Sequence, residues 1–188
     1  MNCIEVNNAT EAFEHWFKLL DSQNLKESSR DGGVKGEVLN AITVIKDPTR
    51  GIVQSDIRKM PMRYAVGELM WYLSGNRDLS AIQNYTKAWD RMSDDGKTVN
   101  SNYGWCIQHK YGFDQWEYVK DMLQTDPLSR QAVLHIKTAD NTPSKDVNCT
   151  VCLQFLIRDG KLHATVYMRS NDIWMGFPYD VFSFTAMQ

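Results

Sequence analysis

Apolar residues recur every three or four positions in several segments of the chain, a spacing that places them on one face of a helix. This pattern predicts helices over residues 8–20, 61–76, 115–124 and, after a Gly-Phe-Pro run, 179–188. Asn8 and Glu11 have the spacing of a capping box, and Asp114 is the expected N-cap of the third helix. Pro61 near the start of the second helix and Gly75 near its end are typical of helix boundaries.

Runs rich in β-branched and aromatic residues lie between these helices and are typical of strands. They predict strands over residues 38–46, 130–138, 149–158 and 161–169. Only Asp159 and Gly160 separate the last two strands, which is the strongest short signal for a type I′ hairpin. The mixture of elements and the length of 188 residues predict one α/β domain over residues 1–188.

The predicted hairpin gathers chemically active side chains at its open end. If the two strands pair without irregularity, Cys149 lies opposite Ser170 and Thr150 lies opposite Arg169. Arg169 is then on the face opposite Cys149, so contact between the guanidinium and the thiol requires a β-bulge near this end. Such a contact would lower the pKa of the Cys149 thiol and make its sulfur a nucleophile. Without it, Cys149 is an ordinary buried strand residue.

Composition narrows the classes of partner. The 21 Lys and Arg residues against 23 Asp and Glu give a net charge of −2, which leaves no broad cationic surface for a nucleic-acid polymer. A small anionic ligand needs only a few arginines. No stretch approaches the roughly 20 apolar residues of a membrane span, and the amino end lacks the pattern of a signal peptide. We therefore expect a soluble, cytoplasmic protein that interacts with neither nucleic acid nor membrane.

The four cysteines have neither a disulfide nor a zinc pattern. Cys149 and Cys152 are three residues apart on a predicted strand and are expected to point to opposite faces. Cys3 and Cys106 are too scattered to complete a metal site or a disulfide scaffold. We therefore expect no metal, and we expect Cys152 to be a core residue.

Short motifs follow one another over almost the whole chain. They are a Gly-rich loop with Arg30, GELMWYLSG around Glu68, AWD at Trp89, NSNYGW around Tyr103, LSRQ around Arg130, Cys149 followed by Gln154 and Phe155, and MRSNDIWMGFPYD at residues 168–180. In this order they resemble the thymidylate synthase and pyrimidine hydroxymethylase family. The resemblance implies an α/β (α+β) fold with a large twisted mixed sheet flanked by helices. It also implies a homodimer that forms through this sheet.

Three positions distinguish the chain from thymidylate synthases, which typically have His, Gln and Asn where this chain has Thr150, Met168 and Asp180. NSNYGW, FLIRD and MRSND look like phage-type deoxycytidylate hydroxymethylases instead. The resemblance thus implies conversion of dCMP or CMP to the 5-hydroxymethyl nucleotide, with 5,10-methylenetetrahydrofolate as co-substrate. Two alternatives remain open: a thymidylate synthase that methylates dUMP to dTMP, and a family member that binds nucleotide without catalysis.

The resemblance assigns the chemistry to Cys149 and Glu68. The thiolate of Cys149 would add to C6 of the pyrimidine, which turns C5 into a carbon nucleophile for the one-carbon unit. Glu68 would shuttle protons, and the aromatic residues beside it on its helix are expected to raise its pKa by burial. An exposed helix glutamate is the alternative.

Asp180 is expected to select the base. Its carboxyl group would accept a hydrogen bond from N4 of cytosine and share a proton with N3, whereas uracil would bring O4 against an oxygen. The alternative is that Asp180 is the N-cap of the last helix.

The roles of the other site residues also come from the resemblance. Arg30 and Arg169 match residues that hold the nucleotide phosphate, and Arg130 matches one that reaches across the dimer interface. Gln131 stands where relatives usually have a second arginine. Seen alone, each arginine could be a solvated surface charge, and the Asp in MRSND could belong to a turn. Further expected contacts are Ser170, Tyr103 and Gln154 for the nucleotide, and Asp172, Trp89 and Gly176 for the folate.

Family members continue with an Asp-x-His-x-Tyr segment whose His and Tyr hold the sugar hydroxyl, and this chain contains no such segment. We expect that it lacks the C-terminal segment of the family or forms its sugar site differently. Deoxyribose and ribose therefore both remain open.

Overall fold

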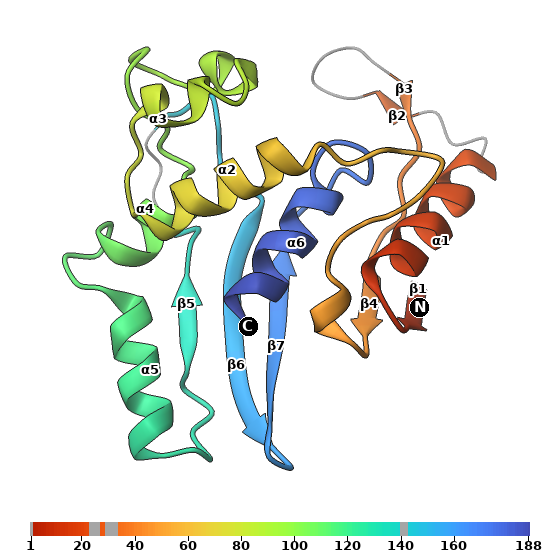
Figure 1. The fold of residues 1–188 in the computed structure, drawn as a ribbon. Helices are drawn as coiled ribbons and strands as arrows, with labels where there is room; N and C mark the ends of the chain where they lie inside the picture. The colour runs from red at the N-terminus through yellow and green to blue at the C-terminus, as the bar shows by residue number, and fades with distance from the viewer. Residues whose placement is uncertain (1, 23–26, 29–33, 140–142) are drawn as a thin grey trace. The chain divides into compact units, whose positions relative to one another are not determined.

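The computed structural model describes residues 2–22, 27–28, 34–139 and 143–188 (Figure 1). The chain forms two compact units, one of Met1–Met60 with Asp172–Met187 and one of Pro61–Asn171 with Gln188. Whether they make up a single domain stays a prediction. None of the helices in the described ranges is both long and apolar enough to cross a bilayer.

Within the described residues, the first unit contains two small sheets and two α-helices. Its elements are β1 (Asn2–Val6), α1 (Ala9–Ser22), β2 (Glu27–Ser28), β3 (Val34–Lys35), β4 (Ala41–Ile45), the 3-10 helix η1 (Pro48–Arg50) and α6 (Phe177–Met187). β1 pairs with β4 in parallel, and β2 pairs with β3 in antiparallel orientation. β4 confirms the predicted strand but begins after residue 38, because Asn40 takes a positive φ of 53° in a turn. The sequence pattern did not indicate β1.

Helix α1 begins at the predicted capping box. The backbone N–H of Glu11 donates to the Asn8 side chain at 3.0 Å, and the Glu11 carboxylate accepts from the backbone N–H of Asn7 at 2.9 Å. The return bond therefore reaches one residue further back than in a standard capping box. On the buried face of α1, Phe13 shares a hydrophobic core with Val181 of α6.

The second unit combines an antiparallel sheet with short helices. Its elements are α2 (Met62–Leu73), α3 (Leu79–Gln83), the 3-10 helix η2 (Ala88–Arg91), α4 (Tyr103–Gln108), α5 (Gln115–Thr125), β5 (Val133–His135), β6 (Thr150–Arg158) and β7 (Lys161–Met168). The strand order is β5–β6–β7 (Figure 1). Asp159 and Gly160 have φ of 51° and 70°, which confirms the type I′ turn between β6 and β7. β5 is shorter than the predicted strand.

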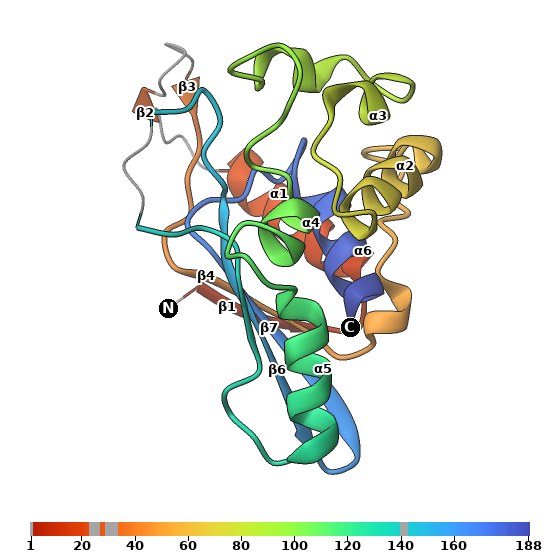
Figure 2. The ribbon, with the colours of Figure 1, turned by 90° about the vertical axis from the view of Figure 1, so that its left-hand side faces the viewer.

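The two faces of this sheet differ. Phe155 is buried, and Trp116 of α5 meets its ring edge-on with the centroids 6.0 Å apart. The helix α5 itself runs alongside the edge strand β5 (Figures 1 and 2). Cys152 is half-buried and pairs with Tyr167, which is 62% exposed on the other face. The expectation that Cys152 belongs to the core is therefore wrong, because strand alternation turns it away from buried Leu153.

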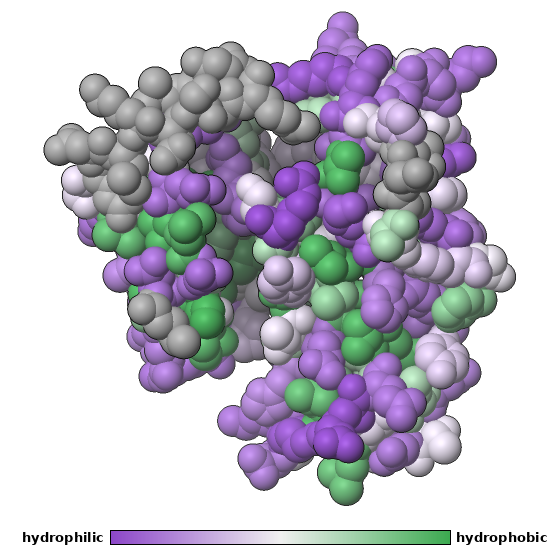
Figure 3. All heavy atoms as spheres, turned by 180° about the vertical axis from the view of Figure 1, so that it is seen from behind, coloured by the Kyte–Doolittle hydropathy of each residue, from purple (hydrophilic) through white to green (hydrophobic). Residues whose placement is uncertain are grey.

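On the side of the protein opposite to that of Figure 1, hydrophobic and hydrophilic residues are interspersed over the surface (Figure 3).

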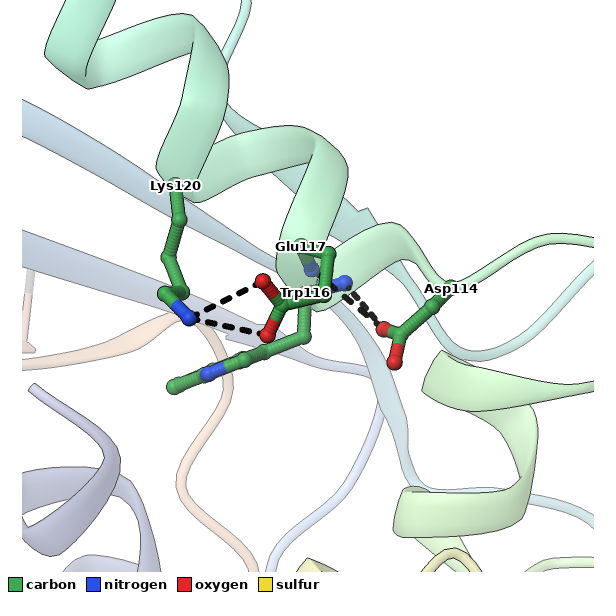
Figure 4. A network of polar contacts seen from close by, with 4 residues as sticks. All are labelled: Asp114, Trp116, Glu117 and Lys120. Carbon is green, nitrogen blue, oxygen red and sulfur yellow. Dashed lines mark hydrogen bonds and ion pairs between the residues drawn. The ribbon is translucent and has the colours of Figure 1, made fainter.

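The predicted boundaries of α2 and α5 are confirmed. Gly75 follows α2 with a positive φ of 66°, the conformation that favours glycine after a helix end. Asp114 caps α5, and its Oδ1 accepts from the backbone N–H groups of Trp116 at 2.8 Å and Glu117 at 3.4 Å (Figure 4). Glu117 also forms an ion pair at 2.8 Å with Lys120, one turn further along (Figure 4).

Candidate active site

Cys149 lies beside a β-bulge at the open end of the β6–β7 hairpin. Cys152 pairs with Tyr167 in the register set by the turn, but Thr150 pairs with Met168 because the register shifts between positions 150 and 152. The backbone N–H of Arg169 consequently donates to the carbonyl oxygen of Cys149 at 2.8 Å. The uninterrupted pairing of Cys149 with Ser170 is therefore wrong, whereas the bulge required for an Arg169 contact is confirmed.

The bulge is held by the strand on the other side of β6. The carbonyl oxygen of Val151, the extra residue, accepts from the N–H groups of Ile136 at 3.0 Å and Lys137 at 3.2 Å. Both residues follow directly after β5. A contact distant in sequence thus fixes the irregularity that brings Cys149 and Arg169 together.

The Arg169 guanidinium is aimed at the cysteine by backbone carbonyls. Nε donates to the carbonyl oxygen of Asn148 at 3.1 Å, and Nη2 donates to that of Val147 at 2.8 Å. Nη2 also lies 3.6 Å from the sulfur of Cys149. A fixed cation at this distance stabilises a thiolate over a thiol. Cys149 is half-buried and Arg169 is exposed, so this end of the hairpin reaches the surface.

An aspartate tethers the segment that precedes the cysteine. Ser144 Oγ donates to Oδ2 of Asp94 at 2.6 Å, and the backbone N–H of Lys145 donates to Oδ1 at 2.8 Å. These two hydrogen bonds, the one from Ser144 first, hold the pKa of Asp94 below its ordinary value of 3.8. The tether joins two loops of the second unit and was not predicted from the sequence, since nothing local marks Asp94.

Glu68 is a buried residue of α2 and accepts a hydrogen bond from the same helix. It is 5% exposed, and the hydroxyl of Tyr64, four residues earlier on α2, donates to its Oε1. The indole Nε1 of half-buried Trp89 donates to the Tyr64 oxygen at 3.1 Å, and its ring meets Trp71 edge-on at 5.4 Å. The expected burial of Glu68 is confirmed, and the alternative of an exposed glutamate is wrong. Tyr64 is one of the aromatic residues that the sequence places beside Glu68 on this helix.

Helix α4 connects these two parts of the second unit. Asn148 is 7% exposed and its Nδ2 donates to the carbonyl oxygen of Ser101, just before α4, at 2.7 Å. Tyr103 of α4 is buried and stacks on Tyr72 of α2 with the centroids 5.0 Å apart. Gly104 lies so close to the Tyr72 carbonyl that a Cβ at this position would overlap it. α4 therefore sets the spacing between α2 and the segment that carries the cysteine.

The other nucleotide residues expected from the sequence lie at different places. Gln154 is half-buried and its Nε2 donates to the carbonyl oxygen of Arg130 at 2.9 Å, which joins β6 to the segment before β5. The side chains of Arg130 and Ser170 are exposed. Arg30 lies outside the described residues. The binding roles of these four residues stay predictions.

Asp172 organises the turn that leads into α6 in the first unit. Its Oδ1 accepts from the backbone N–H groups of Trp174 at 2.8 Å and Met175 at 2.6 Å, and its carbonyl oxygen accepts from Gly176 at 3.0 Å. The turn interpretation of Asp172 is confirmed. Its predicted contact with the folate pterin remains a prediction, as does that of Gly176.

Asp180 lies inside α6 and does not cap it. The helix begins at Phe177, because proline is tolerated in a first turn and Pro178 therefore does not delay the start. The backbone N–H of Asp180 already donates to the carbonyl oxygen of Gly176 at 3.0 Å. The N-cap alternative is wrong; half-buried Asp180 lies in the first turn of the helix, where the helix dipole favours a carboxylate.

No group of three or more His, Cys, Asp or Glu side chains within the described ranges could hold a metal ion. The four cysteines are all free thiols. What the second unit does bring together is a thiol beside a guanidinium and a buried carboxyl beside a phenol and an indole, a combination suited to nucleophilic addition with proton transfer.

The chain belongs to the thymidylate synthase family, whose sequence model matches residues 20–188. It is 32% identical over 154 residues to "Deoxyuridylate hydroxymethyltransferase" of Bacillus phage SP01, a match that covers 74% of this chain and 40% of that protein. Its fold matches the thermostable thymidylate synthase A from Bacillus subtilis with a TM-score of 0.60 and 26% identity, over 70% of this chain and 50% of that one. The chain thus spans half or less of the length of these relatives.

Proposed function

We propose that this chain carries the catalytic centre of a pyrimidine nucleotide C5 hydroxymethyltransferase, with dCMP or CMP as substrate and 5,10-methylenetetrahydrofolate as co-substrate. One observation carries the proposal. The Arg169 guanidinium lies 3.6 Å from the Cys149 sulfur, on a bulge that strict strand pairing would not produce. A strand cysteine with only a packing role needs no such cation.

The roles of the residues follow from their environments. The Cys149 sulfur bonds to C6 of the base, and the same C–S bond breaks when the product leaves. Glu68, buried and 5% exposed, moves protons to and from the bound base. The folate supplies the one-carbon unit, and water supplies the hydroxyl group. Trp89, which is half-buried, would offer an aromatic side chain to the flat pterin ring.

Asp180 supports cytosine as the base. Its side chain is not required to cap α6, and a carboxyl group accepts from N4 of cytosine while it shares a proton with N3. Uracil would instead place O4 against a carboxyl oxygen. An unpaired buried polar group costs about 1 to 3 kcal/mol, enough for a clear preference.

Deoxyuridylate is the second candidate substrate. The 32% identity to a phage protein named deoxyuridylate hydroxymethyltransferase supports hydroxymethylation but favours uracil. The likeness to a solved thymidylate synthase keeps methylation of dUMP as a further alternative. The same likeness is compatible with a family member that binds nucleotide without turnover.

A homodimer is part of the proposal. The open face of the β5–β6–β7 sheet carries Tyr167, which is 62% exposed, beside half-buried Cys152 and Gln154. Large exposed aromatic residues on a sheet face are typical of interfaces. Arg130, exposed beside Gln154, would then reach the site of the partner.

One assay separates these candidates. Release of tritium from the C5 position of labelled dCMP and dUMP is measured with methylenetetrahydrofolate, and the folate product is identified. Release from dCMP with tetrahydrofolate is the expected result. Tetrahydrofolate from dUMP would support the second candidate, dihydrofolate from dUMP would identify a thymidylate synthase, and release from neither nucleotide would favour binding without turnover.

Two cysteine variants provide the controls. Cys149→Ser should abolish release, because an alcohol is far less nucleophilic at neutral pH than a thiolate. Cys152→Ser, three residues further along the chain and also half-buried, should retain it. Equal loss in both variants would contradict the assignment of Cys149.

A further inference from the structure

Tyr64 and Glu68 form a hydrogen bond that the family resemblance does not assign. They lie four residues apart on α2, so their side chains share one helix face. The phenol hydroxyl donates to Oε1 of Glu68, and the carboxyl group is 5% exposed. A hydrogen bond to a buried charged group is stronger than one at the surface, because the local dielectric constant is lower.

The direction of this bond is fixed by Trp89. Its Nε1 lies 3.1 Å from the Tyr64 oxygen, and an indole N–H can donate but cannot accept. The phenol has a single proton, which therefore cannot point at Trp89 and is directed to Glu68. The order of donation is thus Trp89 to Tyr64 to Glu68.

Oε1 of Glu68 accepts a hydrogen bond from the Tyr64 hydroxyl, so a proton on that same oxygen would compete with the phenol proton for the space between the two oxygens. When Glu68 is protonated, the proton is therefore directed to Oε2, the other carboxyl oxygen. We propose that Tyr64 is a positioning residue that selects Oε2 of Glu68 as the oxygen that delivers and receives the proton in the reaction. This inference rests on the proposed proton-shuttling role of Glu68.

The phenol also affects how easily Glu68 ionises. Burial alone favours the neutral acid, whereas a hydroxyl donor favours the carboxylate, so loss of the hydroxyl should raise the pKa of Glu68. Other charged or titratable side chains occur on the elements around Glu68. They are Arg63 and Tyr72 on α2, Tyr103 and Cys106 on α4, and Asp90 and Arg91 on η2, with none on α3. All of them are retained in a Tyr64 variant.

The first test compares Tyr64→Phe in two backgrounds. In the wild-type chain the variant should lower kcat roughly tenfold while KM for the nucleotide stays unchanged, because one hydrogen bond to a charged group is lost. In a Glu68→Gln background the same change should have no further effect on kcat. A merely structural role would lower kcat equally in both backgrounds, and that result would overturn the inference.

Tyr85→Phe is the matched control. The Tyr85 ring also lies against α2, at Gly67, and the residue is 44% exposed and outside the proposed site. Removal of its hydroxyl should leave kcat unchanged. An equal loss of kcat in Tyr85→Phe and Tyr64→Phe would show a general effect on α2 and would also overturn the inference.

A second test does not depend on turnover. The Glu68 carboxyl carbon, labelled with carbon-13 and assigned with Glu68→Gln, is titrated by NMR in the wild-type chain and in Tyr64→Phe. The midpoint should rise by about one pH unit in the variant. An unchanged midpoint would overturn the inference. If the midpoint rises but the chain releases no tritium, only the proposed function is contradicted.

Discussion

The guanidinium of Arg169 is held beside the Cys149 sulfur by hydrogen bonds to the backbone. Two backbone carbonyls hold its Nε and Nη2, so little conformational entropy is lost when the guanidinium stabilises a thiolate. A lysine would supply the same charge, but its single ammonium could not form this pattern of bonds. The planar fork is therefore as important here as the charge.

Arg169→Lys tests this point. We expect the rate of Cys149 alkylation by iodoacetamide at pH 7 to fall several-fold, because the thiolate is less stabilised. Mass spectrometry of the modified peptide measures the rate at each cysteine. Cys152, three residues further along in β6, should react at an unchanged rate. An unchanged rate at Cys149 would contradict the proposed contact.

Asp180→Asn should shift base preference toward dUMP. An amide can donate to O4 of uracil and accept from N3–H, so the ratio of kcat/KM for dUMP over dCMP should rise roughly tenfold or more. Asp180 lies in the first turn of α6, where the helix dipole favours a carboxylate, so the free energy of unfolding should fall by no more than about 1 kcal/mol. If the variant keeps the wild-type ratio of kcat/KM for the two nucleotides, Asp180 does not select the base.

The hairpin illustrates what sequence can and cannot predict about an element. Asp159 and Gly160 determine the turn locally, and both have the positive φ that a type I′ turn requires. The bulge depends on Ile136 and Lys137, whose N–H groups bond to Val151. No pattern within the hairpin reports that distant contact. The chemistry could therefore require a bulge near the open end of the hairpin, but the sequence could not show that Val151 is its extra residue.

The caps of α1 and α5, in contrast, depend on residues close in sequence and could be predicted. Asp114→Ala removes two hydrogen bonds to the first turn of α5 and should lower the free energy of unfolding by about 1 kcal/mol. Urea denaturation measures the change. Asp121→Ala, in the middle of the same helix, is the control and should stay within about 0.5 kcal/mol of wild type.

The Asp94 tether gives a pH-dependent prediction for the loops of the second unit. The pKa of Asp94 is lower in the folded chain than its ordinary value of 3.8, so the ionised form stabilises the fold above that value. This stabilisation is lost as the pH falls through the lower folded-state pKa. Asp94→Asn should therefore be less stable than wild type at pH 7, and the difference should narrow as the pH falls below 4.

Urea denaturation at several pH values measures the Asp94 effect. Asp56→Asn provides a control at an aspartate that lies outside the tether. A difference between Asp94→Asn and wild type that is constant with pH would show that the ionised carboxylate is not what stabilises these loops.

The family motifs are distributed over both compact units, which local patterns could not predict. Asp172, Gly176 and Asp180 belong to the first unit, whereas Cys149 and Glu68 belong to the second. The chain leaves the first unit at Met60 and returns to it at Asp172. Helical periodicity indicated that α6 exists but contained no information on its packing against α1. The family resemblance named the site residues, and the sequence pattern anticipated the burial of Glu68. The donation from Trp89 through Tyr64 to Glu68 could not be predicted, because no local pattern brings Trp89 to that helix.

The proposed homodimer can be tested through the open face of the β5–β6–β7 sheet. Tyr167→Glu would bury a charge at the interface, so the variant should sediment as a monomer under conditions in which wild type is a dimer. Tyr118→Glu, at an exposed position on α5, is the control and should leave the dimer intact. If Tyr167→Glu also sediments like the wild type, this face is excluded as the interface.

Gly104 of α4 is a position at which no side chain fits. Even an alanine methyl group there would collide with the main chain of α2, which cannot rotate aside as a flexible side chain could. Gly112, by contrast, has open space around the position of a Cβ and is constrained only by its φ of 78°. A saturation library selected for growth or turnover should accordingly recover glycine alone at 104, and several residues, asparagine foremost, at 112.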